Sequence, residues 1–154
     1  MLRSQHGFTA VEVAVVSVIL LALAATAFPI YSGYMDDAAV SQAKADCAII
    51  ANAVQMYHRD TNQWPPDQPL GKEVPELFAA PGPYLVNFPK GPKKMIRTEG
   101  ADSGVYRYEK QTKGSNDRAR VTCYGLNKTL QTVWDDYYVP EGKDDIIEFL
   151  NRVP

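Results

Sequence analysis

The pattern of hydrophobic and polar residues divides the chain into two parts. Residues 8–30 are apolar except for one charge, that of Glu12. A helix rises 1.5 Å per residue, so this run would extend roughly 34 Å, which is enough to cross a hydrocarbon core of about 30 Å. The pattern therefore predicts a membrane-spanning helix near the N-terminal end.

A second helical pattern follows without a strong breaker. Apolar residues recur at spacings of three and four beyond Tyr34, which is typical of an amphipathic helix that lays one stripe on a core. The stripe consists of Val40, Ala43, Cys47, Ile50, Val54 and Tyr57. We therefore expect one long helix from about Phe8 to Arg59, hydrophobic all round in its first half and amphipathic in its second.

Pro29 lies inside this predicted helix. Proline has no backbone N–H and crowds the carbonyl four residues earlier, so a kink or a locally opened turn is expected at Pro29. The alternative interpretation is that Pro29 ends the membrane helix.

The rest of the chain predicts a small α+β domain. Residues 61–92 are rich in proline and glycine and indicate an irregular connection, with a short helix at 74–80 and Trp64 covering the end of the long helix. Residues 104–110 and 118–126 alternate apolar and polar positions around a turn at 112–117, which predicts a hairpin. We expect a third strand at 129–134 and a C-terminal helix at 145–151 capped by Asp144. A long helix would then pack on a small antiparallel sheet.

Net charge and cysteine content exclude few classes of binding partner or site. The formal net charge of −2, from 16 basic and 18 acidic residues, gives no reason to expect a polyanion as the main partner. The two cysteines, Cys47 on the core stripe and Cys123 in a predicted strand, lack the spacing of a zinc or thioredoxin-like site. A disulfide bond between them and two buried free thiols both remain open.

The charge of Glu12 is energetically unfavourable inside an apolar membrane helix. A charge at the centre of a membrane helix costs about 2.5–3.5 kcal/mol on insertion scales, and no Lys, Arg or His follows it before Lys44. A cationic partner could be a main-chain amine, created by cutting the chain just before the helix. Two alternatives are a carboxylate that only reaches toward the headgroups, and a simple secretory signal peptide, for which the apolar run is too long and carries a charge.

The residues before Glu12 contain a sequence that resembles a known cleavage site. Gly7-Phe8-Thr9-Ala10-Val11-Glu12, behind a short basic leader, resembles the leader junction of the type IV pilin family, which includes the type II secretion pseudopilins. Thr9 and Pro29 also fit the family, whereas Ala10 and Val11 replace its commoner Leu and Ile. The match covers about the first 35 residues.

The resemblance implies how the chain is processed and assembled. A prepilin peptidase would cleave between Gly7 and Phe8 and methylate the new amine of Phe8. Glu12 would pair with the amine of a neighbouring subunit during assembly, with the amine of its own Phe8 as a competitor, and Thr9 belongs to the same assembly motif. Such pairing would also fix the axial register of two helices.

The expected organisation is a leader peptide at 1–7, a transmembrane and assembly helix at 8–34, and a globular pilin-like domain at 35–154. Arg3 precedes the helix and two acidic residues follow it, so we expect a single-pass protein of the inner membrane with a periplasmic C-terminal domain. After assembly it would belong to a pilus or pseudopilus at the cell surface.

The expected function is that of a type IV pilin-like structural subunit in a homo-oligomeric helical filament, built with the inner-membrane assembly machinery. One alternative is a type II secretion pseudopilin or minor pilin. An alternative of another class is a membrane-tethered periplasmic enzyme or binding domain.

Catalytic, metal and nucleic-acid sites are weakly indicated. After cleavage the only histidine is His58, which does not favour nucleophilic catalysis or a metal-ligand cluster, and no cofactor is expected. A C-terminal acidic group would most simply be a solvated surface, although some pseudopilins bind calcium in this region; it consists of Asp135, Asp136, Glu141, Asp144 and Asp145. Basic and aromatic residues favour an ordinary charged face over a DNA-binding patch; they are Lys90, Lys93, Lys94, Arg97, Arg118, Arg120, Tyr106 and Tyr108.

Overall fold

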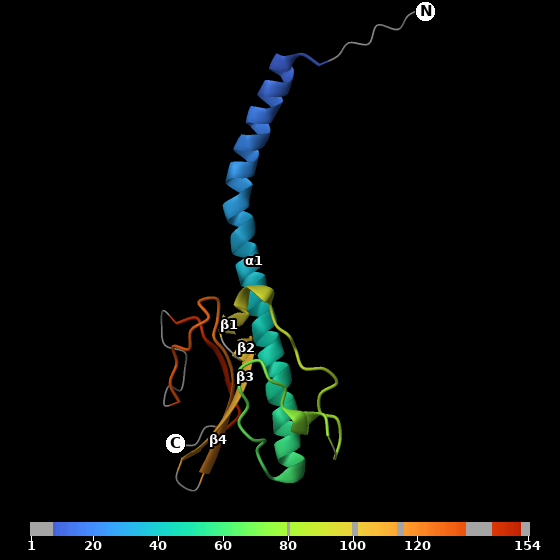
Figure 1. The fold of residues 1–154 in the computed structure, drawn as a ribbon, viewed down its shortest axis with the longest axis vertical. Helices are drawn as coiled ribbons and strands as arrows, with labels where there is room; N and C mark the ends of the chain where they lie inside the picture. Colours follow the sequence, from blue (N-terminus) through green and yellow to red (C-terminus); the bar gives the residue numbers. More distant parts are fainter. Residues whose placement is uncertain (1–7, 80, 100–101, 114–115, 135–142, 152–154) are drawn as a thin grey trace, which may run out of the picture. The chain divides into compact units, whose positions relative to one another are not determined.

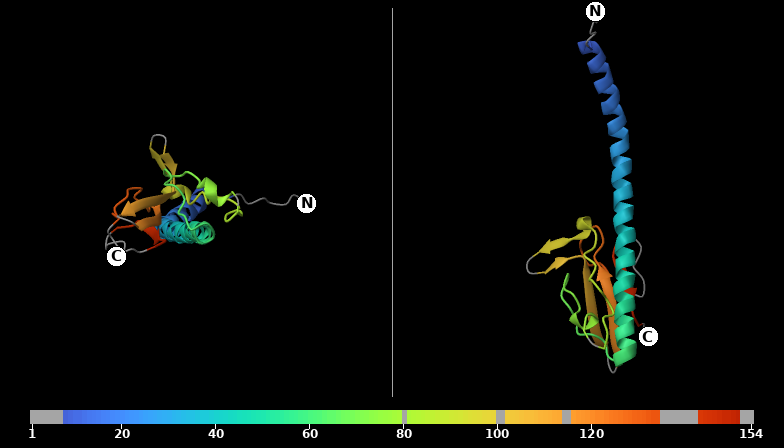
Figure 2. Two further views of the ribbon diagram at one scale, coloured as in Figure 1. Left: turned by 90° about the horizontal axis from the view of Figure 1, so that it is seen from below. Right: turned by 90° about the vertical axis from the view of Figure 1, so that its right-hand side faces the viewer.

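The computed structural model describes residues 8–79, 81–99, 102–113, 116–134 and 143–151. It divides the chain into two compact units, Met1–Asp37 and Ala38–Pro154. Figures 1 and 2 show the long helix and the strands of the second unit.

Helix α1 spans Ala10–Thr61, which confirms the prediction of one long helix. The helix continues through Pro29, so the alternative that Pro29 ends it is wrong. It stops at Asn62, whose φ of 56° is left-handed and whose N–H bonds to the carbonyl of His58 at 2.8 Å. Asparagine tolerates this conformation better than most residues, which accounts for the position of the helix end.

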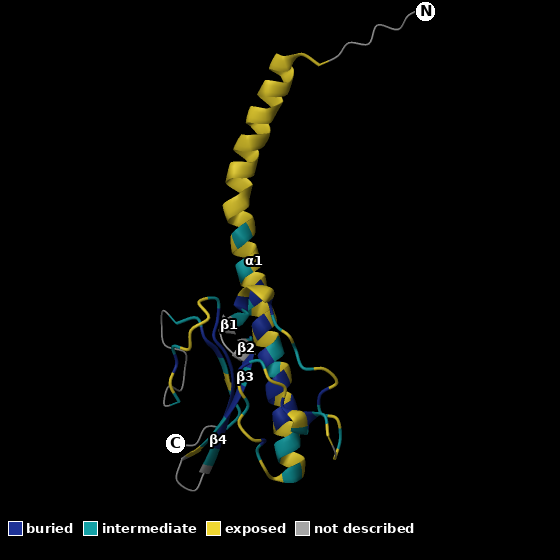
Figure 3. Cartoon of the chain, in the orientation of Figure 1, coloured by how far each residue is buried: buried dark blue, intermediate teal, exposed yellow. Residues whose placement is uncertain are grey.

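Burial along α1 changes between the two units (Figure 3). The first unit is exposed along almost all of its described helix, whereas in the second unit one face is buried. The buried helical residues are Ala39, Ala43, Cys47, Ile50, Ala51, Ala53 and Val54. Val40 and Tyr57 are partly buried against the same core, so the predicted stripe is confirmed.

The sheet of the second unit has three antiparallel strands in the order β3-β4-β5. They are β3 (Tyr106–Lys113), β4 (Asn116–Cys123) and β5 (Ile146–Phe149). The predicted hairpin is confirmed, with Tyr106 opposite Cys123 and Glu109 opposite Arg120. A separate two-stranded hairpin, β1 (Arg97–Glu99) and β2 (Asp102–Gly104), was not predicted.

Two C-terminal elements differ from the prediction. No strand forms at 129–134, where Lys128 has a left-handed φ of 60° and the N–H of Thr129 bonds to the side chain of Asn127 at 2.7 Å. The predicted helix at 145–151 is also wrong, because Ile146–Phe149 form strand β5 beside β4. Pairing with β4 gives Ile146 a buried place opposite Cys123, which a solvent-exposed helical turn would not provide.

The connection between helix and sheet is irregular, as predicted. The short helix expected at 74–80 is reduced to the 3₁₀ turn η1 (Pro75–Leu77), and a second turn, η2 (Lys93–Met95), precedes β1. Part of this connection runs along the edge of β3, since the N–H groups of Gln68 and Gly71 bond to the carbonyls of Tyr108 and Tyr106 at 3.2 and 2.8 Å. This contact covers an edge that would otherwise offer unpaired backbone groups.

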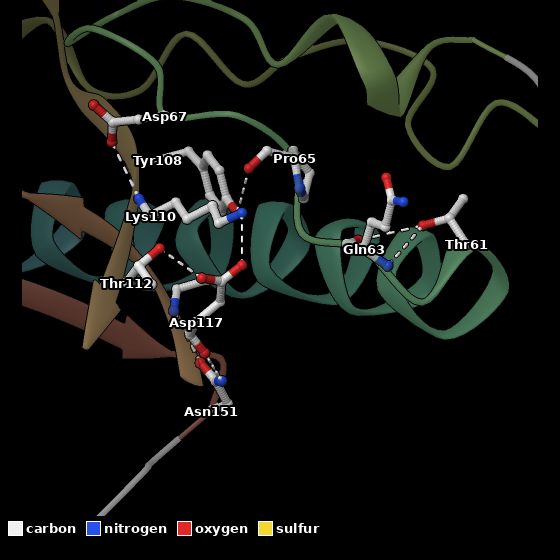
Figure 4. Close-up of polar contacts among 10 residues, drawn as sticks. Thr61, Gln63, Pro65, Asp67, Tyr108, Lys110, Thr112, Asp117 and Asn151 are labelled. Atoms are coloured by element: carbon white, nitrogen blue, oxygen red, sulfur yellow. Dashed lines mark hydrogen bonds and ion pairs between the residues drawn. The ribbon is translucent and has the colours of Figure 1, made fainter. Parts of the chain in front are cut away.

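The inner face of the sheet carries two buried tyrosines, of which Tyr106 bonds to α1 and Tyr108 to the connection after it. Tyr106 donates to Asp46 Oδ2 at 2.6 Å, and Tyr108 donates to the carbonyl of Pro65 at 3.2 Å. Both rings are fully buried. At the other end of the hairpin, Asp117 accepts from Thr112 at 2.6 Å and pairs with Lys110 at 2.7 Å, while its carbonyl accepts from Asn151 at 2.6 Å (Figure 4). The tyrosines, the hairpin contacts and the helix face together fix an α+β arrangement.

Candidate functional site

The first turn of α1 contains a reciprocal capping arrangement between Thr9 and Glu12. The backbone N–H and the hydroxyl of Thr9 both donate to Oε2 of Glu12 at 2.8 Å. In return, the N–H of Glu12 lies 3.2 Å from Oγ1 of Thr9. This is a capping box, in which two backbone donors at a helix start are satisfied by side chains. The sequence analysis placed both residues in an assembly motif but missed this local role, although the Thr-x-x-Glu spacing is its signal.

The capping box leaves part of the carboxylate open. Both bonds from Thr9 end on Oε2, and Oε1 of Glu12 accepts no hydrogen bond from any residue that the structure describes. The backbone N–H that reaches Glu12 belongs to Thr9 and not to Phe8. Glu12 can therefore cap its own helix and still accept a further donor.

The helix around Glu12 is apolar on every side. It is long and apolar enough to cross a membrane, and no part of its most apolar stretch is buried within the chain. Large side chains such as Phe8 and Val11 are exposed, at 88% and 71%. A helix that is hydrophobic all round needs lipid or other helices around it, so this segment fits a membrane anchor.

The hydroxyl groups of this segment bond back to the helix. Ser17 donates to the carbonyl of Val13 at 2.7 Å, and Thr26 donates to that of Leu23 at 2.9 Å. Ser32 donates to the carbonyl of Pro29 at 2.8 Å, next to the proline. These hydroxyls therefore need no water, which suits an apolar environment. A kink at Pro29 stays a prediction.

Cys47 and Cys123 are both free and fully buried in the structure. Cys47 projects from α1 into the core, and Cys123 lies at the end of β4, with its Sγ 3.8 Å from Sδ of Met95. Burial raises the pKa of Cys123 to about 11 and raises that of Cys47 further. Thiols with such pKa values are poor nucleophiles, so in the folded state both behave as core residues. A bridge between them stays a prediction.

The aromatic and basic candidates do not form one surface. Tyr106 and Tyr108 point into the core, whereas Arg120 lies on the other face of the sheet, 1% exposed. Arg120 Nε bonds to Glu109 Oε2 at 2.7 Å, and its guanidinium lies 4.3 Å from the ring centre of Trp134. Tyr106, Tyr108 and Arg120 therefore do not form one exposed face together. The cluster of the buried Arg120 and Glu109 with the half-buried Trp134 was missed, since cross-strand pairing is needed to bring Arg120 and Glu109 together.

Trp64 covers the C-terminal end of α1, as the sequence predicts, and the half-buried His58 of the last helical turn lies beside it. Their rings stack at 3.8 Å between centroids, with 8° between planes. Trp64 is partly buried against the core. This contact accounts for both side chains as packing at the helix end.

The acidic group can be tested only in part, because Asp135, Asp136 and Glu141 lie outside the described residues. Asp144 Oδ2 accepts from the N–H of Asn127 at 2.9 Å, and Asp145 Oδ2 accepts from that of Gln131 at 2.7 Å. The other oxygen of each carboxylate is buried and has no hydrogen-bond partner among the described residues, and the same holds for the hydroxyl of Thr132.

Such oxygens are of the type that calcium prefers, so the side chains of Asp144, Asp145 and Thr132 are chemically suited to calcium, although the pilin resemblance does not extend to a calcium loop. They would hold part of the ligand shell. No group of three or more His, Cys, Asp or Glu side chains suited to a metal occurs among the described residues.

Comparison with known proteins identifies the family. No family model and no solved structure matches the chain. The chain is 37% identical over 98 residues to a type II secretion system core protein G of Aeromonas hydrophila, covering 58% of this chain and 68% of that protein. The protein of the same name from Pseudomonas aeruginosa is 37% identical over 99 residues, covering 58% of this chain and 69% of that protein. That of Klebsiella pneumoniae is 27% identical over 147 residues, covering 94% of each chain.

These matches agree with the leader junction, the apolar helix and the helix-on-sheet domain described above. The chain belongs to the family of type II secretion system core protein G, a family of pseudopilins.

Proposed function

We propose that the chain is a structural subunit of a type II secretion pseudopilus. A prepilin peptidase removes residues 1–7 and methylates Phe8, and residues 8–34 hold the subunit in the inner membrane with residues 35–154 in the periplasm. The inner-membrane assembly machinery then moves it into a helical filament of like subunits. Support comes from the named relatives, which are components of a secretion system.

The observation that carries the proposal is the open oxygen of Glu12. Thr9 occupies Oε2, while Oε1 has no donor among the described residues, in a helix that is apolar on all sides. Cleavage before Phe8 would create an ammonium group at the start of the same helix. An ammonium from a neighbouring subunit would recover much of the cost of an unpaired carboxylate in a low-dielectric environment.

The capping box also bears on which amine Glu12 meets. Within one chain, the N–H of Thr9 already fills the position nearest the carboxylate. The amine of the same chain's Phe8 lies one residue further from the helix. An amine from a second chain can approach Oε1 from outside, so we favour pairing between subunits.

Two other functions were considered from the sequence. A surface pilus subunit shares the same assembly chemistry, but the relatives are secretion proteins, which places the pseudopilin first. A tethered enzyme would need a reactive group, whereas the buried thiols and the stacked His58 are taken up by packing. We therefore infer a structural and not a catalytic role.

The decisive experiment is intact-mass analysis of the chain, with and without a prepilin peptidase. The processed chain should begin at Phe8 and carry one additional methyl group. A mature chain that begins elsewhere would refute the proposal.

A second experiment separates the roles of Glu12. Glu12→Gln keeps the shape and the acceptor for Thr9 but removes the charge, so it should insert into the membrane normally and fail to enter filaments. Glu12→Asp keeps the charge but shortens the reach, and should retain partial assembly. Normal assembly by Glu12→Gln would refute pairing with an amine.

A further inference from the structure

The two edges of the three-stranded sheet differ in whether their backbone groups are bonded. At the β3 edge, the N–H groups of Gly71 and Gln68 donate to strand carbonyls at 2.8 and 3.2 Å. The other edge is β5, the last strand in the order β3-β4-β5. No described segment pairs with its outer side. Within the described residues the sheet therefore has one covered edge and one open edge.

The register with β4 shows which backbone groups of β5 point outward. Successive residues of an antiparallel strand direct their N–H and C=O groups alternately to one side and to the other. Leu150, just after β5, donates its N–H to the carbonyl of Ala119 on β4 at 3.0 Å. Glu148, two residues earlier, therefore bonds to β4 as well. Ile147 and Phe149 direct their backbone groups away from β4, and no described residue bonds to those groups.

The open edge is held in an extended form by contacts at its end. The side-chain amide of Asn151 donates to the carbonyl of Asp117 at 2.6 Å (Figure 4). Its oxygen accepts from the N–H of Ala119 at 2.8 Å. Asp117 and Ala119 both belong to β4, so Asn151 clamps the end of β5 to its neighbour. An edge that is already extended and fixed loses little conformational entropy when another strand adds to it.

One exposed charge lies at the centre of this edge. Glu148 stands between Ile147 and Phe149 and forms no ion pair or hydrogen bond through its side chain with the described residues. Its side chain lies on one face of β5, while those of Ile147 and Phe149, both half-buried, lie on the other. A strand that adds here meets two apolar side chains at the bonding positions and one carboxylate between them.

A second copy of β5 is a poor match for this edge. Ile147 and Phe149 of two copies can bond to each other in one antiparallel register, which sets Glu148 directly opposite Glu148 of the other copy. Such a pair is not hydrogen-bonded, so its side chains lie close together, and like charges directly opposite are destabilising. A cation at the same place would instead pair with Glu148. The charge therefore favours an occupant of different sequence.

We propose that β5 accepts an extended segment of another protein as a fourth, antiparallel strand, with a Lys or Arg opposite Glu148 and an apolar residue on either side of it. The two apolar residues exchange backbone hydrogen bonds with Ile147 and Phe149, and their side chains cover that half-buried pair. In strand addition of this kind, main-chain bonds supply affinity and alternate side chains supply specificity. The inference goes beyond the proposed function, because it needs neither Glu12 nor a filament.

A short synthetic peptide tests the edge on the full chain in detergent. The probe is Thr-Val-Lys-Val-Thr with acetyl and amide ends, and the readout is amide hydrogen exchange at Ile147 and Phe149. Binding should slow exchange at both amides about tenfold, while the amide of Glu148, already bonded to β4, stays unchanged. Unchanged exchange at Ile147 and Phe149 in a large excess of peptide would overturn the proposal.

N-methylated peptides distinguish strand addition from other modes of binding. In the proposed register, the N–H groups of the two valines point to β5 and that of the lysine points away. Methylation of both valine nitrogens should abolish the protection. Methylation of the lysine nitrogen is the matched control and should retain it. Equal effects of the two peptides would overturn the proposal, since binding would then not use these backbone groups.

Reversal of charge tests the role of Glu148. A peptide with Glu in place of Lys should bind the wild type roughly tenfold more weakly, and Glu148→Lys should reverse this preference. Glu73→Lys is the matched control, because Glu73 is exposed and lies in the connection after α1, so this variant should keep the wild-type preference. If both variants change the preference alike, the peptide responds only to net charge and the pair with Glu148 is wrong.

The protein without peptide provides the last outcome. Exchange at Ile147 and Phe149 should not depend on protein concentration. Protection that grows with concentration would assign the edge to a second copy and overturn the proposal. None of these results bears on cleavage before Phe8 or on assembly by Glu12→Gln, so the proposed function is tested separately.

Discussion

Thr9 and Glu12 bind each other at the start of α1, with two hydrogen bonds of 2.8 Å ending on one carboxylate oxygen. The pair resolves an apparent conflict in the sequence, where a carboxylate lies in an apolar helix. Glu12 stabilises its own helix end through one oxygen, and its second oxygen accepts no hydrogen bond from the described residues.

Substitution of Thr9 should separate capping from charge pairing. Thr9→Ala removes the side chain that bonds to the N–H of Glu12 and one donor to its carboxylate, and loss of an N-cap costs about 0.5–2 kcal/mol. We expect faster hydrogen exchange at residues 10–13 and less efficient assembly. Thr9→Ser, which retains the hydroxyl, should resemble the wild type, and equal exchange in both variants would contradict the capping role.

The buried pair of Arg120 and Glu109 should be sensitive to one-sided change. Arg120 is 1% exposed, and its removal in Arg120→Met leaves the buried carboxylate of Glu109 with the hydroxyl of Thr122, at 3.1 Å, and the more distant Arg107, at 3.5 Å. Breaking a buried pair in this way costs about 3–5 kcal/mol. Denaturant unfolding of the full chain in detergent would measure this loss in the free energy of unfolding.

A partly exposed ion pair on the same sheet is the control for that experiment. Lys110 pairs with Asp117 at 2.7 Å near the surface, so Lys110→Met should cost about 1 kcal/mol or less. The double variant Glu109→Gln/Arg120→Met should be more stable than Arg120→Met alone. If it is not, the loss comes from packing under Trp134 and not from charge.

The free energy of unfolding should fall at alkaline pH, because the buried thiols lose their protons. Cys123 has an ordinary pKa of 9.0 and a folded pKa of about 11, raised by burial. The folded state holds this proton more tightly, so its stabilising effect is complete below pH 9 and is lost as the pH rises through 11. The loss amounts to on the order of 2–3 kcal/mol for this group.

Cys123→Ala tests the alkaline prediction. It removes one titrating group, so the free energy of unfolding should fall less steeply between pH 9 and 11 than in the wild type. Its absolute stability at pH 7 is not the criterion, because the substitution also leaves a small cavity. An unchanged slope would assign the alkaline loss to other groups, such as the buried Tyr106 and Tyr108, whose pKa values are also raised by burial.

Calcium should stabilise the domain if the buried oxygens of Asp144 and Asp145 are ligands. A ligand at a hundred times its Kd adds about 2.7 kcal/mol, so thermal unfolding of the full chain should shift upward in millimolar calcium and return with a chelator. Asp145→Asn should abolish the shift, while Asp37→Asn, on the exposed helix, should keep it. An identical shift in both variants would place the ion elsewhere.

The long helix and its core stripe could be predicted because both depend on local spacing. Ala43, Cys47 and Ile50 lie within two turns of one another, so one stretch of sequence shows which face they share. The β3–β4 hairpin was predictable for the same reason, since its strands are adjacent in sequence and alternate. The errors at residues 129–134 and 145–151 concern segments whose structure depends on distant partners.

The sequence by itself determined that an apolar helix begins beside Gly7-Phe8 and carries Glu12 within its first turns, because hydrophobicity, spacing and the leader junction are all local. Only the tertiary structure decided that Ile146 completes a sheet beside Cys123, that Tyr106 reaches Asp46, and that Ile49 and Met56 remain exposed. Those outcomes depend on which surfaces meet when the helix closes on the sheet, and contacts between residues far apart in sequence leave no periodic mark in either segment.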